Sequence, residues 1–314
     1  MNKNINKVIK DDESIYPIII KNKDIDLQLK PFLKWPGGKR NISKHIYDSM
    51  PKNFNNFIEP FVGAGSVFMG YFSDLNLNNN FEKKILINDI NSELINVYNC
   101  IRKDYKKLIC EINKINDDFM LDPKNKFYEI RQWDRDETFK EIDVFKKAAR
   151  TIFLNKTCFN GLFRVNSDGY FNTPWNGKIK VNFYDIKNLK NISNFLKKVN
   201  ILNKDFNDII NYVSKGDFIY FDPPYDVLNK NTFTSYDKTG FNRDDQKKLA
   251  DMFKKLDKMG CFVMMSNHNT EFIQNLYEQF NFKYIKASRN VNSDGSKRSK
   301  VTELIITNYK LEKN

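Results

Sequence analysis

Asp222 and Tyr225, separated by two prolines, have the residue types and spacing to act on the amino group of a planar ring. The Asp222 carboxylate and the carbonyl of Pro223 can accept the two amino hydrogens, while the Tyr225 ring stacks on the planar base. Proline has no N–H, so the pair Pro223 and Pro224 holds that carbonyl rigidly without a competing donor. The plainer alternative is a turn in which Asp222 caps a neighbouring element and Tyr225 packs.

The residues before Asp222 predict the element that positions it. Residues 218–221 form a continuous run of aromatic and β-branched side chains, which is expected of a central parallel strand covered on both faces. The two prolines end the ladder, so the backbone leaves the sheet at this point. Because ligands of open α/β sheets bind outside the carboxyl ends of the strands, we expect Asp222 and Tyr225 at a binding site.

A second motif indicates a nucleotide-like ligand. Gly63 and Gly65 follow a predicted strand at residues 56–62 and precede a helix, as in the binding turn of a doubly wound sheet. One Gly-x-Gly pair suits a ligand without a pyrophosphate. The next predicted strand, residues 84–88, ends at Asp89, which is placed to accept ribose hydroxyls. A solvated aspartate is the alternative for Asp89.

An earlier turn adds a cation. Trp35 is followed by Pro36, two glycines and Lys39. This turn must be sharp, and its glycines let the backbone approach a ligand closely. Lys39 then suits a carboxylate or phosphate, although a basic surface loop with a core tryptophan fits the same residues.

The remaining core strands are predicted farther along the chain. Residues 199–203 form a third strand, followed by Asp205 and Phe206, an acid and a ring that can grip an adenine. For His268 we favour a loop or capping role over a general base. Further strands are predicted at residues 261–265, 282–289 and 301–309, the last two as an antiparallel pair at the sheet edge.

Residues 103–191 break the alternation of strands and helices. Two helices are predicted, at residues 103–116 and 141–155, and aromatic arms then flank an Asn-Ser-Asp-Gly turn at residues 166–169, a hairpin signal. A hairpin can enter the major groove, where Arg and Asn make bidentate contacts with guanine and adenine. A surface hairpin with its aromatic residues packed underneath is the alternative.

Composition limits the class of protein. The 314 residues suffice for a sizeable core, and the formal charge of +13 indicates a polyanionic partner, with a general bias toward Lys, Asn and Ile as the alternative. Four cysteines and two histidines show no metal-type spacing, so we expect no metal and a reduced, cytoplasmic setting. The early apolar run, residues 15–20, is too short to span a membrane, and no signal peptide is recognisable.

The motif from Asp222 to Tyr225 resembles that of amino-methyltransferases that methylate adenine N6 in DNA. Matches across residues 31–309 resemble the Dam-type (class alpha, D12 family) DNA adenine methyltransferases in particular. The resemblance implies a Rossmann-like α/β methyltransferase fold, with a mostly parallel twisted sheet and an antiparallel C-terminal edge. It also implies an inserted, mostly helical target-recognition domain at residues 103–191, between catalytic segments 31–102 and 192–314, after an extension at residues 1–30.

The same resemblance implies roles for individual residues. Arg164 is expected to read a base and Leu162 to wedge into the base stack. Apart from the resemblance, the basic loop with Arg289, Lys297, Arg298 and Lys300 suggests phosphate contacts, with a merely solvated loop as the alternative. The catalytic residues are then Asp222, Pro223, Pro224 and Tyr225. The donor-binding residues are Trp35, Gly38, Lys39, Phe61, Gly63, Gly65, Asp89, Asp205, Phe206 and Asp222. The DNA-binding residues are Asn160, Leu162, Arg164, Pro174, Arg289, Lys297 and Arg298.

The implied reaction is methyl transfer from S-adenosyl-L-methionine to adenine N6 in double-stranded DNA, within GATC, by base flipping and direct transfer. We expect a monomer or weak dimer in a bacterial or phage-like cytoplasm, associated with the nucleoid and either solitary or part of a restriction-modification system. Two alternatives stay open at this point. The first is a methyltransferase acting on RNA or another amino group, and the second is a catalytically silent DNA-binding protein.

Overall fold

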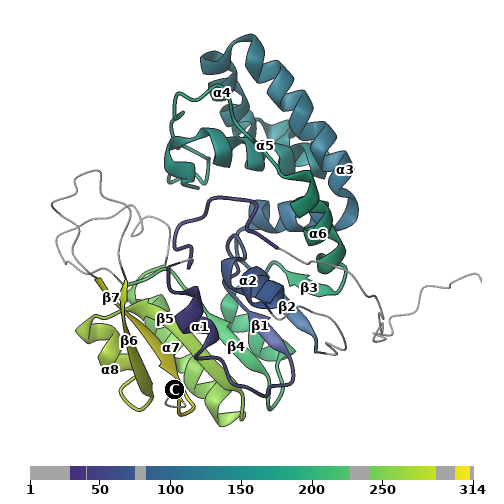
Figure 1. Ribbon diagram of the computed structural model, residues 1–314. Helices are drawn as coiled ribbons and strands as arrows, with labels where there is room; N and C mark the ends of the chain where they lie inside the picture. The colour runs from purple at the N-terminus through teal and green to yellow at the C-terminus, as the bar shows by residue number, and fades with distance from the viewer. Residues whose placement is uncertain (1–28, 40, 75–82, 227–240, 288–300, 312–314) are drawn as a thin grey trace, which may run out of the picture.

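The computed structural model describes residues 29–39, 41–74, 83–226, 241–287 and 301–311 (Figure 1). Within these residues, seven strands form one sheet in the order β3-β2-β1-β4-β5-β7-β6. The strands are β1 (Phe57–Glu59), β2 (Ile85–Asn88), β3 (Val199–Leu202), β4 (Phe218–Phe221), β5 (Phe262–His268), β6 (Asn281–Ala287) and β7 (Val301–Thr307).

The sheet is parallel from β3 to β5, and β7 and β6 add an antiparallel edge. The predicted mostly parallel sheet with an antiparallel C-terminal edge is therefore confirmed. The chain builds outward from β1 to β2 and β3, and then returns to place β4 on the other side of β1. The space outside the carboxyl ends of β1 and β4 is thus the switch point of the sheet, where ligands of such folds bind.

Two strands differ in length from their predictions. β1 ends at Glu59 rather than at residue 62, because Pro60 follows and cannot donate to the ladder. β5 continues to His268 rather than stopping at residue 265, because the distant strand β7 pairs with its last residues. His268 therefore lies at the end of a strand, and the prediction that it lies in a loop is wrong.

Alternate side chains of the central strand enter two different cores. On β4, Phe218 and Tyr220 pack on the side of α2 (Ser66–Asp74), α3 (Ser92–Leu121) and α6 (Ile186–Leu196). Ile219 and Phe221 pack on the side of α7 (Arg243–Lys258) and α8 (Glu271–Leu276). Since both faces are covered, every residue of β4 is buried, as the continuous apolar run predicts.

Local signals fix where the long helices begin. A capping box between Asn242 and Asp245 starts α7, and the Asn91 side chain accepts the Leu94 N–H at the start of α3. The helix predicted at residues 103–116 is a continuation of α3, which runs to Leu121. The backbone of α3 breaks at Asp104 (φ −160°, ψ 88°), close to the predicted start of the inserted domain.

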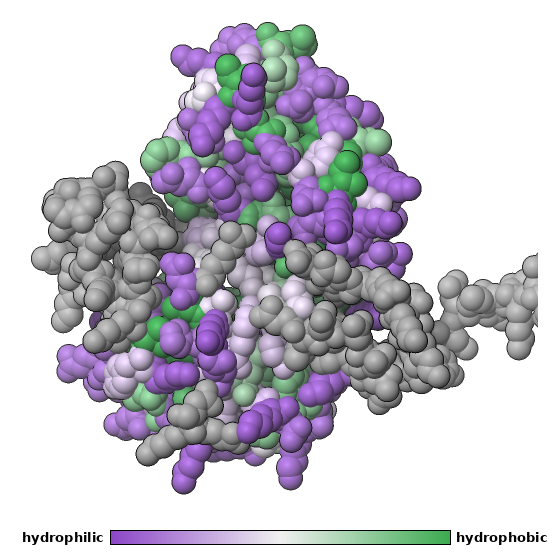
Figure 2. Space-filling view, viewed as in Figure 1, coloured by the Kyte–Doolittle hydropathy of each residue, from purple (hydrophilic) through white to green (hydrophobic). Residues whose placement is uncertain are grey.

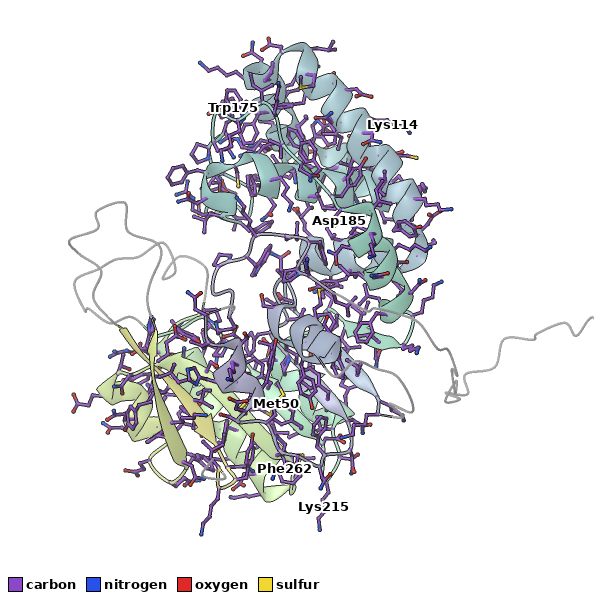
Figure 3. All side chains as sticks on the ribbon, viewed as in Figure 1. Met50, Lys114, Trp175, Asp185, Lys215 and Phe262 are labelled. Carbon is purple, nitrogen blue, oxygen red and sulfur yellow. The ribbon has the colours of Figure 1, made fainter. Side chains whose placement is uncertain are left out.

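The second half of α3 packs with α4 (Pro123–Gln132) and α5 (Val144–Thr157) into a helical part beyond the sheet (Figure 1). Shorter elements complete the described chain: α1 (Ser43–Tyr47) and the 3₁₀ turns η1 (Trp133–Arg135), η2 (Glu137–Glu141), η3 (Phe159–Gly161) and η4 (Phe206–Tyr212). Figure 3 labels Trp175 in the helical part, and Phe262, the first residue of β5, at the far end of the sheet. The carboxyl ends of the parallel strands therefore face the helical part.

Hydrophilic residues dominate the visible surface of the helical part, with smaller apolar areas between them (Figure 2). In the described ranges, no helix has the length and apolarity required to cross a membrane. The same ranges contain no group of three or more His, Cys, Asp or Glu side chains that could hold a metal ion.

Candidate active site

The sheet brings the two sequence motifs to one edge. β1 and β4 pair side by side and in parallel, so the glycine turn after β1 and Asp222 after β4 leave the sheet next to each other. Lys39 joins them, because its Nζ lies 2.7 Å from Asp222 Oδ1. Three segments that are far apart in the sequence thus meet at the switch point.

Asp222 is an acceptor in an unusual electrostatic setting. Burial raises the pKa of its carboxyl to about 6, and the Glu303 carboxylate acts in the same direction, while the Lys39 ammonium opposes both. The Lys39 side chain is itself only 5% exposed, and its ammonium lies 4.5 Å from the centre of the Tyr225 ring. The Lys39 ammonium therefore contacts the Asp222 carboxylate and the face of the Tyr225 ring at the same time. Another N–H group at this position could make the same two contacts.

Glu59 lies beneath this ion pair at the end of β1. Burial raises the pKa of its carboxyl well above the usual range, and the charge of Asp222 adds to that rise in pKa. The carboxyl accepts the Phe68 N–H at 3.2 Å, in the first turn of α2. This hydrogen bond ties the start of α2 to the end of β1.

A chain of buried hydrogen bonds fixes the turn after Asp222. Gln246 Nε2 donates to the Pro224 carbonyl at 2.8 Å, and Asn267 Nδ2 donates to Gln246 Oε1 at 3.1 Å. Asn267 Oδ1 in turn accepts the Asp226 N–H at 3.0 Å. Sequence reasoning missed Gln246, although a polar residue one turn before the apolar Leu249 of α7 is a signal that could have found it.

Side chains of β5 and β7 contact the Tyr225 ring. Its hydroxyl donates to Glu303 Oε2 of β7 at 3.2 Å. The His268 ring of β5 meets it edge-on, with 4.8 Å between ring centres and 76° between planes. The His268 Nδ1 contacts the Asp226 carbonyl, so this imidazole packs against the turn.

The glycine turn after β1 accepts only glycine at two positions. Gly63 (φ +49°) and Gly65 (φ +75°) have left-handed backbones. A Cβ on Gly63 would lie 2.8 Å from Trp35 Cδ1, and a Cβ on Gly65 would lie 2.4 Å from Phe68 Cε1. The Tyr98 hydroxyl also donates to the Gly63 carbonyl at 2.9 Å. The turn is therefore shaped by close packing around it.

Asp89 holds that turn as well. Its Oδ2 accepts the Gly63 N–H at 3.0 Å and its Oδ1 accepts the Asn91 N–H at 2.9 Å. Sequence analysis expected Asp89 to meet a ribose, but it did not anticipate this bond to the glycine turn. Each carboxylate oxygen has a second lone pair, so the bond leaves acceptor capacity at the end of β2.

Aromatic residues line the next part of the edge. The Phe61 ring packs on Phe206, with 5.4 Å between ring centres. Asp205 is exposed and caps η4, since its Oδ1 accepts both hydrogen bonds from Asn207. Trp35 stacks on Phe163, with 5.5 Å between ring centres and 29° between ring planes. The turn at residues 35–39 therefore contacts the predicted hairpin.

Residues 158–175 form the predicted hairpin. Bridges join Cys158 to Trp175 and Val165 to Phe171, and the Asn166 N–H donates to the Tyr170 carbonyl at 2.9 Å across the turn.

Four of the seven predicted DNA-binding residues lie along this hairpin. Arg164 is held by Asn172, which accepts its Nε at 2.6 Å. Asn160 is exposed with a left-handed backbone (φ +56°), Pro174 is exposed and Leu162 is half-buried.

The sequence comparisons agree with this geometry. A sequence model of the D12 class N6 adenine-specific DNA methyltransferases matches residues 35–291. The chain belongs to this family.

Curated relatives extend the match beyond the motifs. The chain is 42% identical over 295 residues to the type II methyltransferase M.MjaIII of Methanocaldococcus jannaschii, covering 90% of this chain and all of that protein. It is 37% identical to the type II methyltransferase M1.LlaDCHI of Lactococcus lactis subsp. cremoris, covering 93% of this chain and 99% of that protein. It is 35% identical to a DNA adenine methylase of Haemophilus influenzae, covering 89% of this chain and 93% of that protein. The protein is therefore a DNA adenine methyltransferase, and the predicted enzyme class is confirmed.

Arg131 and Arg135, which were not predicted as site residues, join Arg164 at the returning arm of the methyltransferase's hairpin. Arg135 Nη2 donates to the Phe171 carbonyl at 3.0 Å, and Arg131 and Arg164 both donate to the Asn172 carbonyl. Residues 133–137 are densely charged, but the sequence alone does not show that Arg135 forms a hydrogen bond with the hairpin. These bonds tie the returning arm of the hairpin to α4 and η1.

Several predicted residues lie outside the described part of the methyltransferase. They include Arg289, Lys297 and Arg298, and nearly all of the extension predicted at residues 1–30.

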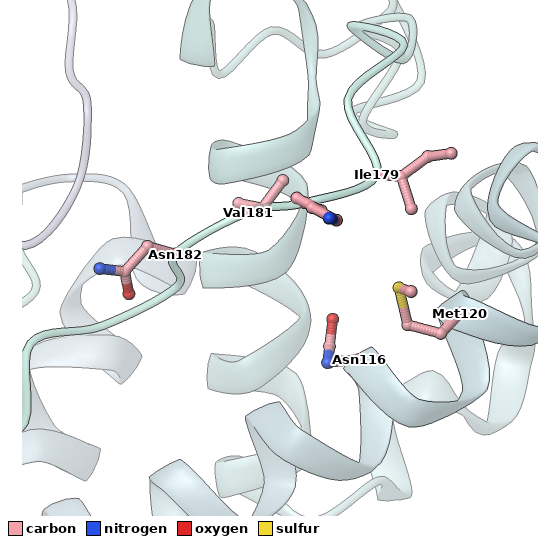
Figure 4. Close-up of a pocket in the computed structure, with 6 residues that line it drawn as sticks. Asn116, Met120, Ile179, Val181 and Asn182 are labelled. Atoms are coloured by element: carbon pink, nitrogen blue, oxygen red, sulfur yellow. The ribbon is translucent and has the colours of Figure 1, made fainter.

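Two hollows among the described residues lie away from Asp222. One, of about 430 Å³, lies between α3 and residues 179–182 and is lined by Asn116, Met120, Ile179, Lys180, Val181 and Asn182 (Figure 4). The other, of about 210 Å³, lies beside the start of α6. The lining of the first hollow contains no acidic side chain, so this hollow does not match the chemistry proposed for Asp222.

Proposed function

We propose that the enzyme transfers the methyl group of S-adenosyl-L-methionine to N6 of adenine in duplex DNA, within GATC, after the base has left the helix. The main support is the buried carboxylate of Asp222, which lies beside the glycine turn at the switch point and is paired with Lys39. This arrangement offers an amino group an acceptor at the edge where a nucleoside-like donor would bind.

The residues at this edge fit the proposed donor. Asp89 and Asp205 are carboxylates at the ends of β2 and β3, where they can accept ribose hydroxyls and an adenine amino group. Phe61 and Phe206 supply an apolar wall, and Lys39 supplies a positive charge. We also assign Trp35, Gly38, Gly63 and Gly65 to the donor site. When bound, the donor supplies a methyl group that is already activated by its positively charged sulfur.

We assign the grip on the adenine amine to Asp222 and Pro223. The amine takes the acceptor that the Lys39 ammonium occupies in this structure. Gln246 already donates to the Pro224 carbonyl, so the second amino hydrogen is assigned to the Pro223 carbonyl. Accepting both hydrogens draws electron density onto a nitrogen whose lone pair is otherwise delocalised into the ring. It also favours the pyramidal geometry of attack.

The main catalytic contribution in this account is alignment. Holding the amine in line with the methyl group can supply about 7–11 kcal/mol. The proton lost by the methylated nitrogen passes to the Asp222 carboxylate. A cysteine intermediate has no place in this scheme, since burial raises the pKa of the Cys158 and Cys261 thiols to about 11.

We propose that residues 103–191 recognise the target site. Arg164 reads a base, Leu162 wedges into the stack, and Asn160 and Pro174 contact the DNA around them. Flipping the adenine costs a few kcal/mol, which stacking on Tyr225 and the wedge offset. We assign phosphate contacts to Arg289, Lys297 and Arg298 in the basic stretch before β7.

The direct test is expression in cells that lack adenine methylation, followed by digestion of their DNA with nucleases that distinguish methylated from unmethylated GATC. Protection at GATC supports the proposal. If the DNA contains N6-methyladenine but is not protected at GATC, the result would support the proposed reaction and contradict GATC as the target sequence. Methyl transfer to RNA but not to duplex DNA would overturn the DNA substrate, and DNA binding without transfer would leave a silent binding protein.

A further inference from the structure

Glu303 reaches the active site from a strand that the sequence places far from it. β7 runs antiparallel to β5, so its first residues lie beside the carboxyl ends of the parallel strands. In this register Glu303 stands opposite His268 on β5 and opposite Ile285 on β6. The antiparallel edge therefore delivers a carboxylate to the rim where Asp222 and Tyr225 lie.

The contacts of Tyr225 show what this carboxylate does. The two prolines fix the backbone before the ring, but a tyrosine side chain still has two torsions of its own. Glu303 accepts the phenolic hydroxyl at 3.2 Å, at the far end of the ring from the backbone. His268 supports one edge, and Lys39 Nζ lies over the ring at 4.5 Å from its centre. The ring is thus held at both ends.

We propose that Glu303 is a positioning residue for the substrate base: by holding the Tyr225 hydroxyl, it sets the plane on which the adenine stacks beside Asp222. This inference rests on the proposed function, because it assigns the ring of Tyr225 to the flipped adenine. Glu303 does not touch the reacting atoms. It acts through Tyr225.

Glu303 also acts on Asp222 through its charge. The groups that face Asp222 and Tyr225 are Lys39 from the first turn, Glu59 on β1, Tyr220 on β4, His268 on β5 and Glu303 on β7. Among them Glu303 favours protonation of Asp222 and Lys39 opposes it. Replacing Glu303 with a neutral residue should therefore lower the pKa of Asp222, so that Asp222 stays ionised at lower pH.

A double-mutant cycle tests the positioning role. Tyr225→Phe and Glu303→Ala each remove one end of the same hydrogen bond, and each should raise the KM for duplex DNA roughly tenfold, as expected for one bond to a charged group. The double variant should be no worse than either single variant, because the shared bond is already lost. Additive losses would show that the two side chains act separately and would overturn the proposal.

Glu303→Gln separates the hydrogen bond from the charge. Its amide oxygen can still accept the Tyr225 hydroxyl, so it should restore most of the KM lost in Glu303→Ala. At the same time the acid limb of the kcat/KM profile should move to lower pH. His268 is present in both proteins, so the comparison isolates residue 303. A Gln variant as impaired as Ala, with an unmoved acid limb, would show a merely structural role.

The wild-type enzyme separates failure of this inference from failure of the proposed function. If wild-type protein forms N6-methyladenine in duplex DNA while every variant at residue 303 matches it in KM and pH profile, only the role of Glu303 is lost. If wild-type protein transfers no methyl group to adenine in DNA, the proposed function fails, and the role of Glu303 fails with it. Melting temperatures of all variants show whether any loss reflects unfolding.

Discussion

Asp222 and Lys39 form the smallest unit that explains the site. A buried carboxylate would be costly without its ammonium partner. In the proposed function, the substrate amine takes the place of the Lys39 ammonium, so Asp222 would stay paired before and during the reaction. Lys39 would then act as a placeholder for the amine.

The pH dependence of methyl transfer should report Asp222. Its pKa of about 6 lies above the usual range, so the carboxyl is protonated below that pH and cannot accept both an N–H and the departing proton. Since this pKa belongs to the enzyme without substrate, we expect kcat/KM to be flat at neutral pH and to fall about tenfold per unit below pH 6. Because Lys39 lowers this pKa, Lys39→Met should move the fall to higher pH.

Lys44→Met is the matched control, since Lys44 is an exposed lysine of α1 in the same part of the chain. Its pH profile should coincide with that of wild type. An acid limb that stays in place in Lys39→Met would show that Asp222 is not the group that titrates.

Among the elements, the glycine turn after β1 is the least tolerant of change. Gly65→Ala combines a left-handed backbone with a Cβ 2.4 Å from Phe68, so it should destabilise the fold and weaken donor binding. Gly177→Ala is the control, because Gly177 has a similar φ of +79° but open space around it. It should cost only the backbone strain of about 1–2 kcal/mol. Urea unfolding and donor titration measure both effects, and equal losses in the two variants would contradict the packing argument.

The helical part depends on one buried cation. Arg150 of α5 is fully buried, donates to the Ile130 and Arg131 carbonyls, and pairs with Asp134 at 2.9 Å. Asp134 Oδ2 also accepts the Phe171 N–H of the hairpin. Arg150→Met leaves Asp134 without this partner and should lower the free energy of unfolding by about 3–5 kcal/mol.

Lys124→Met, at an exposed site on α4, should change the unfolding free energy by less than about 0.5 kcal/mol. If Arg150→Met is as mild as this control, Arg150 does not hold the hairpin to the helices.

The sequence predicted the elements whose positions are determined by residues close to them in the chain. The apolar run of β4 ends at two prolines, and the glycine turn follows β1, so both could be placed without any knowledge of distant contacts. The end of β5 could not, because its last residues become strand only by pairing with β7. Gln246, Asn267 and Glu303 were missed for the same reason. Each is a single polar residue whose partner lies on another element.

At the scale of the whole molecule, the sheet and the helical part meet around the proposed reaction. Trp35 stacks on Phe163 of the hairpin, and Asn155 of α5 bonds to the carbonyls of both Lys34 and Gly161. The proposed DNA-binding hairpin and the proposed donor-binding turn therefore share one packed junction. The division into catalytic and recognition domains remains a prediction.

The most direct measurement is transfer of a labelled methyl group from S-adenosyl-L-methionine to a duplex containing GATC, by wild-type enzyme and by Asp222→Ala, with Asp251→Ala on the exposed face of α7 as control. The account predicts labelled N6-methyladenine from wild type and from the control, and a loss of at least a thousandfold in an Asp222→Ala protein that is still folded, on the order of the largest losses on removing a catalytic group. A folded Asp222→Ala protein that still methylates adenine would contradict it.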